Sequence, residues 1–349
     1  MKTRTPSKEP RQEAAIARAL VRWFRRAHRD LPWRRTRDPY AVWVSEIMLQ
    51  QTRVDVVVPY YERFLVRFPA VETLACAPLD DVLEHWAGLG YYRRARQLHA
   101  AAASVVRDHA GAVPADESAL RALPGIGRYT AGAIRSIAFG EPAPIVDGNV
   151  ARVLSRLFAL RGGPGEAAWE KRLWELAGSL VPASDPSAFN QGLMELGATV
   201  CTPRAPLCPS CPLARNCRAH ALGRAEAYPP ARWRPQVERV ERWALVARRT
   251  KDDALWLSQK PAGEPNAGQW EFPLVEPSPG GPPDGARVLG AIRHAILARD
   301  YRIRAYAVPA TEARRASKGA WVVRSAPGAR AITTVTRKIL ALMEPRASD

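Results

Sequence analysis

Four of the five cysteines lie close together, in the pattern Cys201-x6-Cys208-x2-Cys211-x5-Cys217. Four thiolates within one short loop can bind either a zinc ion or a [4Fe–4S] cluster. A zinc ribbon usually carries two CxxC pairs and this loop has one, so the spacing favours the iron–sulfur cluster and leaves zinc as the alternative. Four free structural cysteines are the least favoured interpretation, because clustered thiols are costly to keep unreactive. We therefore expect a loop that folds around a metal.

The residues before this loop follow a helical pattern. Ile16, Leu20 and Phe24 belong to an apolar stripe with i, i+3, i+4 spacing, which predicts an amphipathic helix. No alternation of apolar and polar residues of useful length occurs in this part, so we expect it to be all-α. Further helices are expected over about 40–52, 54–68, a segment beginning at Pro78, an alanine-rich segment ending near His109, 116–123, 128–139, 149–160, 166–181 and 187–199.

The pattern changes after the cysteines. Proline-rich stretches at Tyr228–Pro230 and Arg232–Pro235 indicate a linker. Strands are expected over Trp243–Ala247, Ala254–Ser258, Val288–Ile292 and Tyr301–Val308, and a short helix over Thr333–Met343. The sequence thus predicts a multi-domain protein: an all-α domain over residues 11–219 that includes the cysteine loop 201–217, a linker over 220–236 and a small α/β domain over 237–349.

The composition restricts the partners of such a protein. The chain has 349 residues and 47% of them are hydrophobic, which is ample for packed cores. Its formal net charge of +18 favours a polyanionic partner such as nucleic acid, although a general preference for arginine is the alternative explanation. No apolar stretch approaches the ~18 residues that span a bilayer, so we expect no membrane contact and a cytoplasmic location.

A glycine-containing turn, Leu123-Pro-Gly-Ile-Gly-Arg-Tyr-Thr130, lies between two expected helices. Gly125 and Gly127 permit a tight turn and a close backbone approach. The N–H groups of the turn and of the next helix would point at an anion, as in a helix–hairpin–helix that binds the DNA backbone. A tight turn between two packed helices uses similar residues and is the alternative.

Two carboxylates stand out by their surroundings. Glu46 lies among large apolar residues in Val42–Gln50, and an acid in an apolar site has a raised pKa that suits a general acid. A glutamate on a helix surface is the alternative. Asp147 precedes a helix that begins near Asn149, so it is a candidate N-cap, a role that is compatible with catalysis. Two carboxylates on either side of a glycosidic bond are typical of glycoside hydrolysis.

These motifs together resemble the MutY-type adenine DNA glycosylases, which belong to the helix–hairpin–helix superfamily of endonuclease III. The resemblance covers most of residues 15–217. It rests on Leu31-Pro-Trp-Arg34, Val44-Ser-Glu-Ile-Met-Leu-Gln-Gln-Thr52, Gly88-Leu-Gly-Tyr-Tyr92, Leu123–Thr130, Val146-Asp-Gly-Asn-Val150, Phe189-Asn-Gln191 and the four cysteines. The segments Trp243–Arg248 and Gly268–Pro273 resemble the Nudix-like C-terminal domain of that family.

The resemblance implies roles for individual residues. Glu46 would protonate the adenine, Asp147 would stabilise the cationic sugar, Asn149 would orient Asp147, and Tyr129 would lie near both carboxylates. Arg29, Trp33 and Arg34 would line the pocket for a flipped adenine, and Gln51, Thr52, Leu89 and Tyr91 would contact the opposite base or wedge beside it. Gln191, Gly125 and Gly127 complete the expected DNA-binding set. Leu89 as a core residue and Tyr91 as the start of a helix are the alternatives.

Two positions limit the activity that the resemblance implies. Bifunctional relatives carry a lysine at the position of Tyr129, and a phenol cannot readily replace that amine, so we expect a monofunctional enzyme. The family senses 8-oxoguanine with a Phe-Ser-His loop after an Arg-His pair, but here Arg293-His294 is followed by Ala295-Ile-Leu-Ala-Arg-Asp300. No Nudix catalytic motif follows Pro273, so we expect no nucleotide hydrolysis by the second domain.

The sequence thus predicts a monomeric DNA glycosylase with a [4Fe–4S] cluster that removes adenine mispaired with 8-oxoguanine or guanine from double-stranded DNA. Two alternatives remain. One is a glycosylase of the same fold that acts on mismatched thymine or on oxidised pyrimidines. The other is a non-catalytic DNA-binding module.

Overall fold

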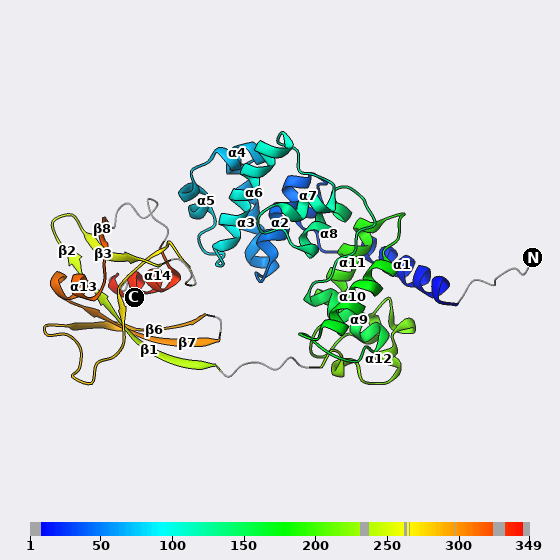
Figure 1. Cartoon of the computed structure of the whole chain (residues 1–349). Coiled ribbons are helices and arrows are strands. Elements are labelled where there is room, and N and C mark those ends of the chain that lie inside the picture. Colours follow the sequence, from blue (N-terminus) through cyan, green and yellow to red (C-terminus); the bar gives the residue numbers. More distant parts are fainter. Residues whose placement is uncertain are drawn as a thin grey trace, which may run out of the picture. The chain divides into compact units, whose positions relative to one another are not determined.

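The computed structural model of the protein describes residues 8–230, 237–261, 264, 266–296, 298–323 and 332–344 (Figure 1). The expected linker segment Arg232–Pro235 lies outside the described residues. The chain divides into two compact units, Met1–Cys76 with Gln97–Trp233 and Ala77–Arg96 with Arg234–Asp349. Each unit is described by itself.

The first unit is built from helices, and the described residues 8–230 contain no strand, which confirms the expected all-α character. The α-helices of the first unit are α1 (Lys8–Ala27), α2 (Pro39–Leu49), α3 (Val54–Arg67), α4 (Val71–Cys76), α6 (Arg93–His109), α7 (Glu117–Ala122), α8 (Arg128–Ile137), α9 (Gly148–Phe158), α10 (Ala167–Leu180), α11 (Pro186–Thr199) and α12 (Arg218–Ala221). Helix α6 begins in the segment that is grouped with the second unit.

Aspartates fix where several helices of this unit begin. The carboxylate of Asp38 accepts hydrogen bonds from the first-turn amides of α2, and Asp116, Asp147 and Asp185 do the same for α7, α9 and α11. Such caps satisfy backbone N–H groups that have no partner within the helix. The resulting helix positions match the expected ones to within a few residues.

The core of the first unit lies between helices α1, α9, α10 and α11. Leu20 of α1 and Phe189 and Leu193 of α11 are almost completely buried in it. Helix α2 is buried along nearly its whole length, from Tyr40 to Met48, with Glu46 among these residues. A buried helix therefore holds a carboxylate inside the unit, next to the helices that make the core.

The second unit contains two sheets with helices. In the first sheet the strand order is β5-β1-β7-β6, and in the second it is β2-β3-β4 with β8 paired to β3. The elements are α5 (Leu79–His85), β1 (Glu238–Val246), β2 (Arg248–Arg249), β3 (Ala254–Gln259), β4 (Trp270–Glu271), β5 (Leu274–Val275), β6 (Arg287–Ile296), β7 (Arg299–Ala307), α13 (Ala310–Ala316), β8 (Ala320–Val323) and α14 (Thr334–Met343).

The four strands expected from the sequence correspond to β1, β3, β6 and β7, and the closing helix corresponds to α14. Strands β1 and β7 are parallel, whereas β6 and β7 form an antiparallel pair in which β6 runs to Ile296 and β7 starts at Arg299. The segment Ala295–Asp300 therefore forms mainly the tips of two paired strands, and Leu297 lies outside the described residues. Among the described helices, none is long and apolar enough to cross a membrane.

Candidate active site

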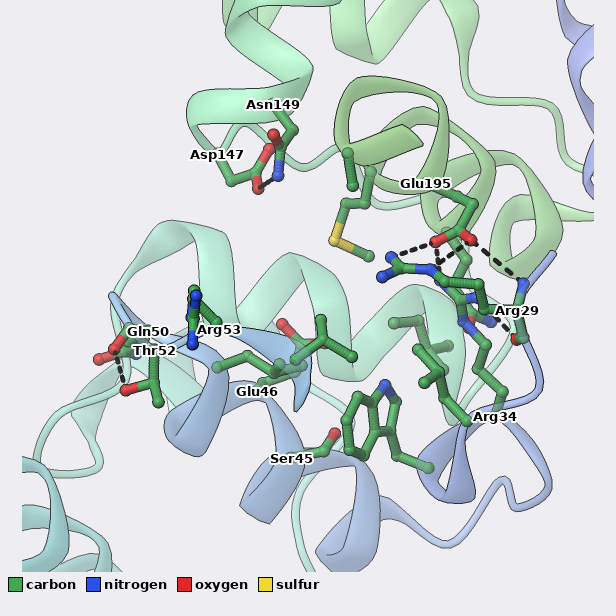
Figure 2. Close-up of a pocket in the computed structure, with 18 of the residues that line it drawn as sticks. Arg29, Arg34, Ser45, Glu46, Gln50, Thr52, Arg53, Asp147, Asn149 and Glu195 are labelled. Atoms are coloured by element: carbon green, nitrogen blue, oxygen red, sulfur yellow. Dashed lines mark hydrogen bonds and ion pairs between the residues drawn. The ribbon is translucent and has the colours of Figure 1, made fainter. Parts of the chain in front are cut away.

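A cavity of about 630 Å³ in the first unit collects most of the residues that the sequence analysis selected. Its walls come from the segment before α2, from α2 and the turn that follows it, from α8, from the start of α9 and from α11. The expected residues that line it are Arg29, Trp33, Arg34, Glu46, Gln51, Thr52, Tyr129, Asp147, Asn149 and Gln191. Figure 2 shows Glu46 on α2, with Asp147 and Asn149 on another wall.

Glu46 is an acid held in an apolar wall. Its residue exposure is only 4%, and its neighbours on α2 are buried as well. The pKa of Glu46 is raised to about 7, chiefly by burial; the Asp147 carboxylate also acts to raise it, whereas the Tyr129 hydrogen bond and the charge of Arg34 act to lower it. An ordinary glutamate is ionised at neutral pH, whereas the raised pKa of Glu46 favours retention of its proton at neutral pH. The group therefore has the protonation equilibrium of a general acid.

Tyr129 lies between Glu46 and Met194. Its hydroxyl lies 2.7 Å from Glu46 Oε2 and 3.1 Å from the sulfur of Met194. It can donate its proton to an ionised Glu46, or accept one from a protonated Glu46 while donating to the sulfur. Burial and the two neighbouring carboxylates raise the pKa of Tyr129 well above its usual value, so the phenol stays neutral.

Asp147 has both carboxylate oxygens held by its own helix. Oδ1 accepts a hydrogen bond of 2.7 Å from the Val150 amide, and Oδ2 accepts one of 3.2 Å from Nδ2 of Asn149. The expected N-cap role is therefore confirmed, and the same residue lines the cavity. Burial raises the pKa of Asp147 despite these hydrogen bonds. Arg152 donates to Oδ1 of Asn149 at 2.8 Å, which fixes the orientation of the amide toward Asp147.

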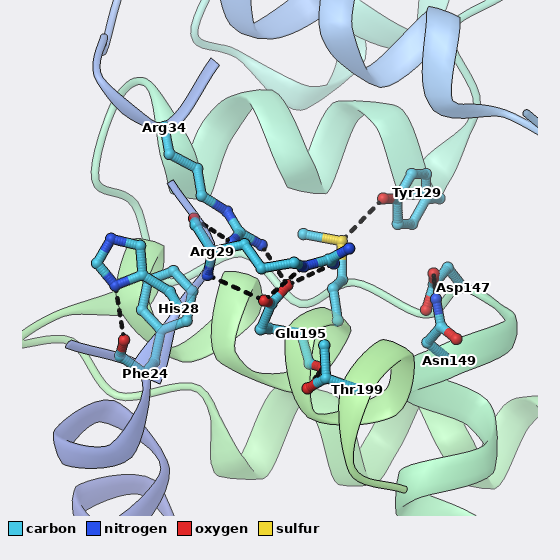
Figure 3. A network of polar contacts seen from close by, with 10 residues as sticks. Phe24, His28, Arg29, Arg34, Tyr129, Asp147, Asn149, Glu195 and Thr199 are labelled. Atoms are coloured by element: carbon cyan, nitrogen blue, oxygen red, sulfur yellow. Dashed lines mark hydrogen bonds and ion pairs between the residues drawn. The ribbon is translucent and has the colours of Figure 1, made fainter. Parts of the chain in front are cut away.

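Glu195 was not predicted, and it is the second buried carboxylate of the cavity. Its side chain is 1% exposed and it accepts hydrogen bonds from Arg29 and Arg34 at 2.7–2.8 Å (Figure 3). Burial acts to raise the pKa of Glu195, but the two guanidinium groups outweigh it and hold that pKa at about 2. Arg29 and Arg34 thus line the cavity as expected, yet they do so as partners of a carboxylate.

The sequence signal for Glu195 was the same as for Glu46. Glu195 lies in Gly192-Leu-Met-Glu-Leu-Gly197, a largely apolar stretch of α11. Gly197 was also missed: a Cβ there would lie 2.6 Å from Cβ of Asn149, so its glycine allows α11 to approach the start of α9. This close approach positions the amide that holds Asp147.

Two other expected residues are not part of this cavity. Leu89 and Tyr91 lie in the segment grouped with the second unit, where Leu89 is buried and Tyr91 is 51% exposed. Tyr91 and the cavity residue Gln51 both have left-handed backbone angles, with φ of +48° and +57°. Such a φ is uncommon for residues other than glycine and is often found at functional sites.

The turn between α7 and α8 requires only one of its two glycines for conformational reasons. Gly125 has a φ of +80°, and a Cβ there would come within 2.8 Å of the Gln97 side chain. Gly127 is the N-cap of α8 with a φ of −92°, and nothing lies within 4 Å of the place where a Cβ would be. Gly127 and Arg128, where α8 begins, are both exposed.

The four cysteines of the loop line one small cavity of about 30 Å³. The pKa of the Cys211 thiol is raised to about 11, chiefly by burial and also by the other three cysteines. Arg156 of α9 donates to Sγ of Cys201 at 3.3 Å and to the carbonyl oxygens of Thr202 and Pro203. In the described part of the chain, no three His, Cys, Asp or Glu side chains are placed to hold one metal ion.

Comparison with known proteins agrees with this geometry. Residues 44–179 match the sequence model of the HhH-GPD superfamily of base excision DNA repair proteins. Over 271 residues, 74% of this chain, the sequence is 44% identical to an adenine DNA glycosylase of Rattus norvegicus and covers 51% of that protein. Over 245 residues, 70% of this chain, it is 36% identical to an adenine DNA glycosylase of Buchnera aphidicola and covers 69% of it.

The chain belongs to the adenine DNA glycosylase family of the HhH-GPD superfamily. It spans about half the length of the rodent relatives that it matches. Two solved structures share the fold of the helical unit. A thermostable thymine-DNA glycosylase has a TM-score of 0.56 and 34% identity, covering 62% of this chain and 100% of that one. An endonuclease III in a non-covalent DNA complex has a TM-score of 0.52 and 26% identity, covering 61% of this chain and 97% of that one.

Proposed function

We propose that this protein is a monofunctional DNA glycosylase that flips adenine out of a mispair with 8-oxoguanine or guanine and hydrolyses its glycosidic bond. The single observation that carries this proposal is the pairing of Glu46 and Asp147 in one cavity, with the pKa of Glu46 raised to about 7. Membership of the adenine DNA glycosylase family supports adenine as the base that leaves. We further propose that the protein works as a monomer in the cytoplasm, bound to double-stranded DNA.

The cavity accounts for the steps of such a reaction. An adenine within a duplex is inaccessible to a buried acid, so it must leave the stack, which costs a few kcal/mol and costs least at a mispair. Protonated Glu46 donates its proton to the adenine ring as the bond to the sugar breaks. Asp147 stabilises the resulting oxocarbenium-like sugar, and water then adds to it. Tyr129 holds Glu46 in place, and Asn149 does the same for Asp147.

The position of Tyr129 supports a monofunctional reaction. A lysine at this position could attack the sugar and lead to strand cleavage, whereas the buried phenol of Tyr129 stays neutral and cannot form a Schiff base. The expected product is therefore an abasic site in an uncut strand.

The four cysteines suit a [4Fe–4S] cluster, and we propose that Cys201, Cys208, Cys211 and Cys217 hold one. Four partly buried cysteines line one cavity, and burial raises the pKa of the Cys211 and Cys217 thiols. A cluster would supply iron that binds the sulfurs as thiolates and would hold the loop folded. The chain's own contribution is Arg156, which donates to Sγ of Cys201 and to the carbonyl oxygens of Cys201, Thr202 and Pro203. A brown protein that absorbs near 400 nm and contains iron and labile sulfide supports this; a colourless protein that contains zinc refutes it.

The test of the proposed function is a single-turnover assay on three duplexes that differ only in the base opposite adenine: 8-oxoguanine, guanine or cytosine. We expect adenine release from the first two and little from the third. The segment Ala295–Asp300 lacks the polar groups of the family's lesion-sensing loop. Equal rates on the first two duplexes mean that lesion sensing is lost, and release from none of them refutes the glycosylase in favour of a DNA-binding module.

A further inference from the structure

The hydroxyl of Tyr129 has two hydrogen-bond partners that differ greatly in strength as acceptors. One is Oε2 of Glu46 at 2.7 Å, and the other is the sulfur of Met194 at 3.1 Å (Figure 3). A phenol carries a single proton, so it donates to one of these groups at a time. Tyr129 lies on α8 and Met194 on α11, and both line the cavity. The proposed reaction uses Glu46 and Tyr129 and leaves the thioether of Met194 without a role.

The protonation state of Glu46 decides which acceptor the hydroxyl uses. An ionised carboxylate is a strong acceptor and has no proton to give, so the hydroxyl then donates to Glu46. A protonated carboxyl group can itself donate to the phenol oxygen, and the phenol proton then turns toward the weaker acceptor, the sulfur of Met194. The sulfur therefore receives its hydrogen bond only while Glu46 is protonated. A hydrogen bond that forms in only one protonation state favours that state.

The surroundings of the hydroxyl make the sulfur important. Among the described residues, no third group lies within hydrogen-bond distance of the Tyr129 hydroxyl. If Met194 were apolar throughout, a phenol that accepts a proton from Glu46 would have no acceptor for its own proton. An unsatisfied polar hydrogen inside a protein is costly, so the protonated state of Glu46 would lose stability.

We propose that Met194 is a positioning residue of the glycosylase reaction: its sulfur accepts the Tyr129 proton while Glu46 is protonated and gives it up when Glu46 has protonated the adenine. The inference rests on the proposed function, because it takes Glu46 as the acid. No covalent bond of Tyr129 or Met194 breaks. The hydroxyl only rotates, and the proton that reaches the adenine comes from Glu46. Tyr129 thus helps to hold that proton before the transfer and stabilises the carboxylate after it.

Charged groups around Glu46 offer another route by which Met194 could act. Asp147 acts to raise the pKa of Glu46, and Arg34 acts to lower it. Arg34 is paired with Glu195, which follows Met194 on α11. A change at Met194 could therefore reach Glu46 through Arg34 instead of Tyr129, and the experiment has to separate the two routes. Besides Glu46, the charged and titratable residues that line the cavity are Arg29, Arg34, Arg53, Tyr129, Asp147 and Glu195.

The experiment measures the pH dependence of single-turnover adenine release by the full chain carrying Met194→Leu, Tyr129→Phe or both changes. Leucine has nearly the volume of methionine and removes the acceptor. We expect Met194→Leu to move the alkaline decline of the rate to lower pH by about half a unit, because one weak hydrogen bond to the protonated state is lost. Added to Tyr129→Phe, the same change should produce no shift. The matched control is Met343→Leu in α14 of the second unit.

Norleucine provides a second variant with a still smaller change of shape. It replaces the sulfur of each of the four methionines by a methylene group, so a folding defect of Met194→Leu does not end the test. The norleucine-containing protein should show the same shift to lower pH as Met194→Leu. Its control is norleucine-containing Tyr129→Phe, which should show no shift relative to Tyr129→Phe.

The ¹³C chemical shift of the Glu46 carboxyl group, assigned with Glu46→Gln, reports the same titration without any turnover. A titration that does not move in Met194→Leu, moves to higher pH, or moves equally with and without the Tyr129 hydroxyl overturns the inference. A lower rate with an unmoved alkaline decline shows that Met194 only fills space, which also overturns it. If the unmodified protein releases no adenine, the proposed function fails, and the chemical shift still tests the hydrogen bond to Met194.

Discussion

Two buried glutamates in one cavity have opposite electrostatic behaviour. Glu46 has no cation as a hydrogen-bond partner, and its pKa is raised to about 7. Glu195 is just as inaccessible, yet two arginines hold its pKa at about 2. Burial alone therefore does not make an acid catalyst; the partners of the carboxyl group decide whether it can give up a proton at neutral pH. Glu46 can serve as the acid, while Glu195 stays ionised at neutral pH and positions Arg29 and Arg34.

The largest expected difference between the two glutamates is in catalysis. Glu46→Gln removes the proton donor, so we expect single-turnover adenine release to fall by about 10²- to 10⁴-fold. Binding to an adenine–guanine duplex should be retained, because the amide has nearly the same shape. Glu62→Gln, on the exposed surface of α3, is the matched control. Normal release by Glu46→Gln would show that the acid is another group.

The second difference is in stability at neutral pH. Glu195→Gln leaves Arg29 and Arg34 without their anionic partner, and loss of one partner of a buried ion pair costs about 3 kcal/mol of unfolding free energy. Chemical denaturation measures this loss. Asp30→Asn, which breaks an exposed pair with Arg35, should leave the unfolding midpoint unchanged. Equal effects of the two variants would contradict the buried network.

The third difference is the sign of the pH dependence of stability. Ionised Glu46 is penalised by burial, and this penalty appears as the pH rises above the pKa of an unfolded glutamate and is complete above about pH 7. Glu46→Gln should therefore stabilise the protein at pH 8, by about 1–3 kcal/mol, and have little effect near pH 4. The contribution of Glu195 has the opposite sign: it is present above the pKa of an unfolded glutamate and is lost as the pH falls toward 2. A destabilising Glu46→Gln at pH 8 would contradict the account.

The smallest expected effect concerns Tyr129. Its hydrogen bond lowers the pKa of Glu46, so Tyr129→Phe should move the loss of activity at alkaline pH to higher pH. At pH values below this alkaline decline the rate should fall about fivefold, which corresponds to the loss of one hydrogen bond of about 1 kcal/mol. Rate measurements across pH separate the two effects. If the alkaline decline of the rate moved to lower pH in Tyr129→Phe, Tyr129 would not lower the pKa of Glu46.

Much of the site could be predicted from the sequence because its signals are local. Glu46 lies in an apolar helix, Asp147 stands where a helix begins, and the cysteines are close in sequence. Glu195 also lies in an apolar helix, but its pairing with two arginines could not be predicted from that local pattern. Its partners Arg29 and Arg34 are 166 and 161 residues away, and only the packing of α11 against the start of the chain brings them together.

The fold shows the same limit. The long helices and the strands β1, β3, β6 and β7 carry their own hydrophobic pattern, so the sequence predicts them. Strands β2, β4 and β5 have two residues each, which is too short for any periodicity, and they exist only through pairing with their neighbours. The register of β1, β6 and β7 is likewise specified by no local pattern.

The most direct test of the central claim is the pH dependence of single-turnover adenine release by the unmodified protein at saturating enzyme. If a protonated Glu46 is the acid, the rate stays constant up to about pH 7 and then falls about tenfold for each further pH unit. In Glu46→Gln this alkaline decline disappears along with most of the activity. A rate that is constant or rising from pH 7 to 9 would contradict the assignment of Glu46 as the acid.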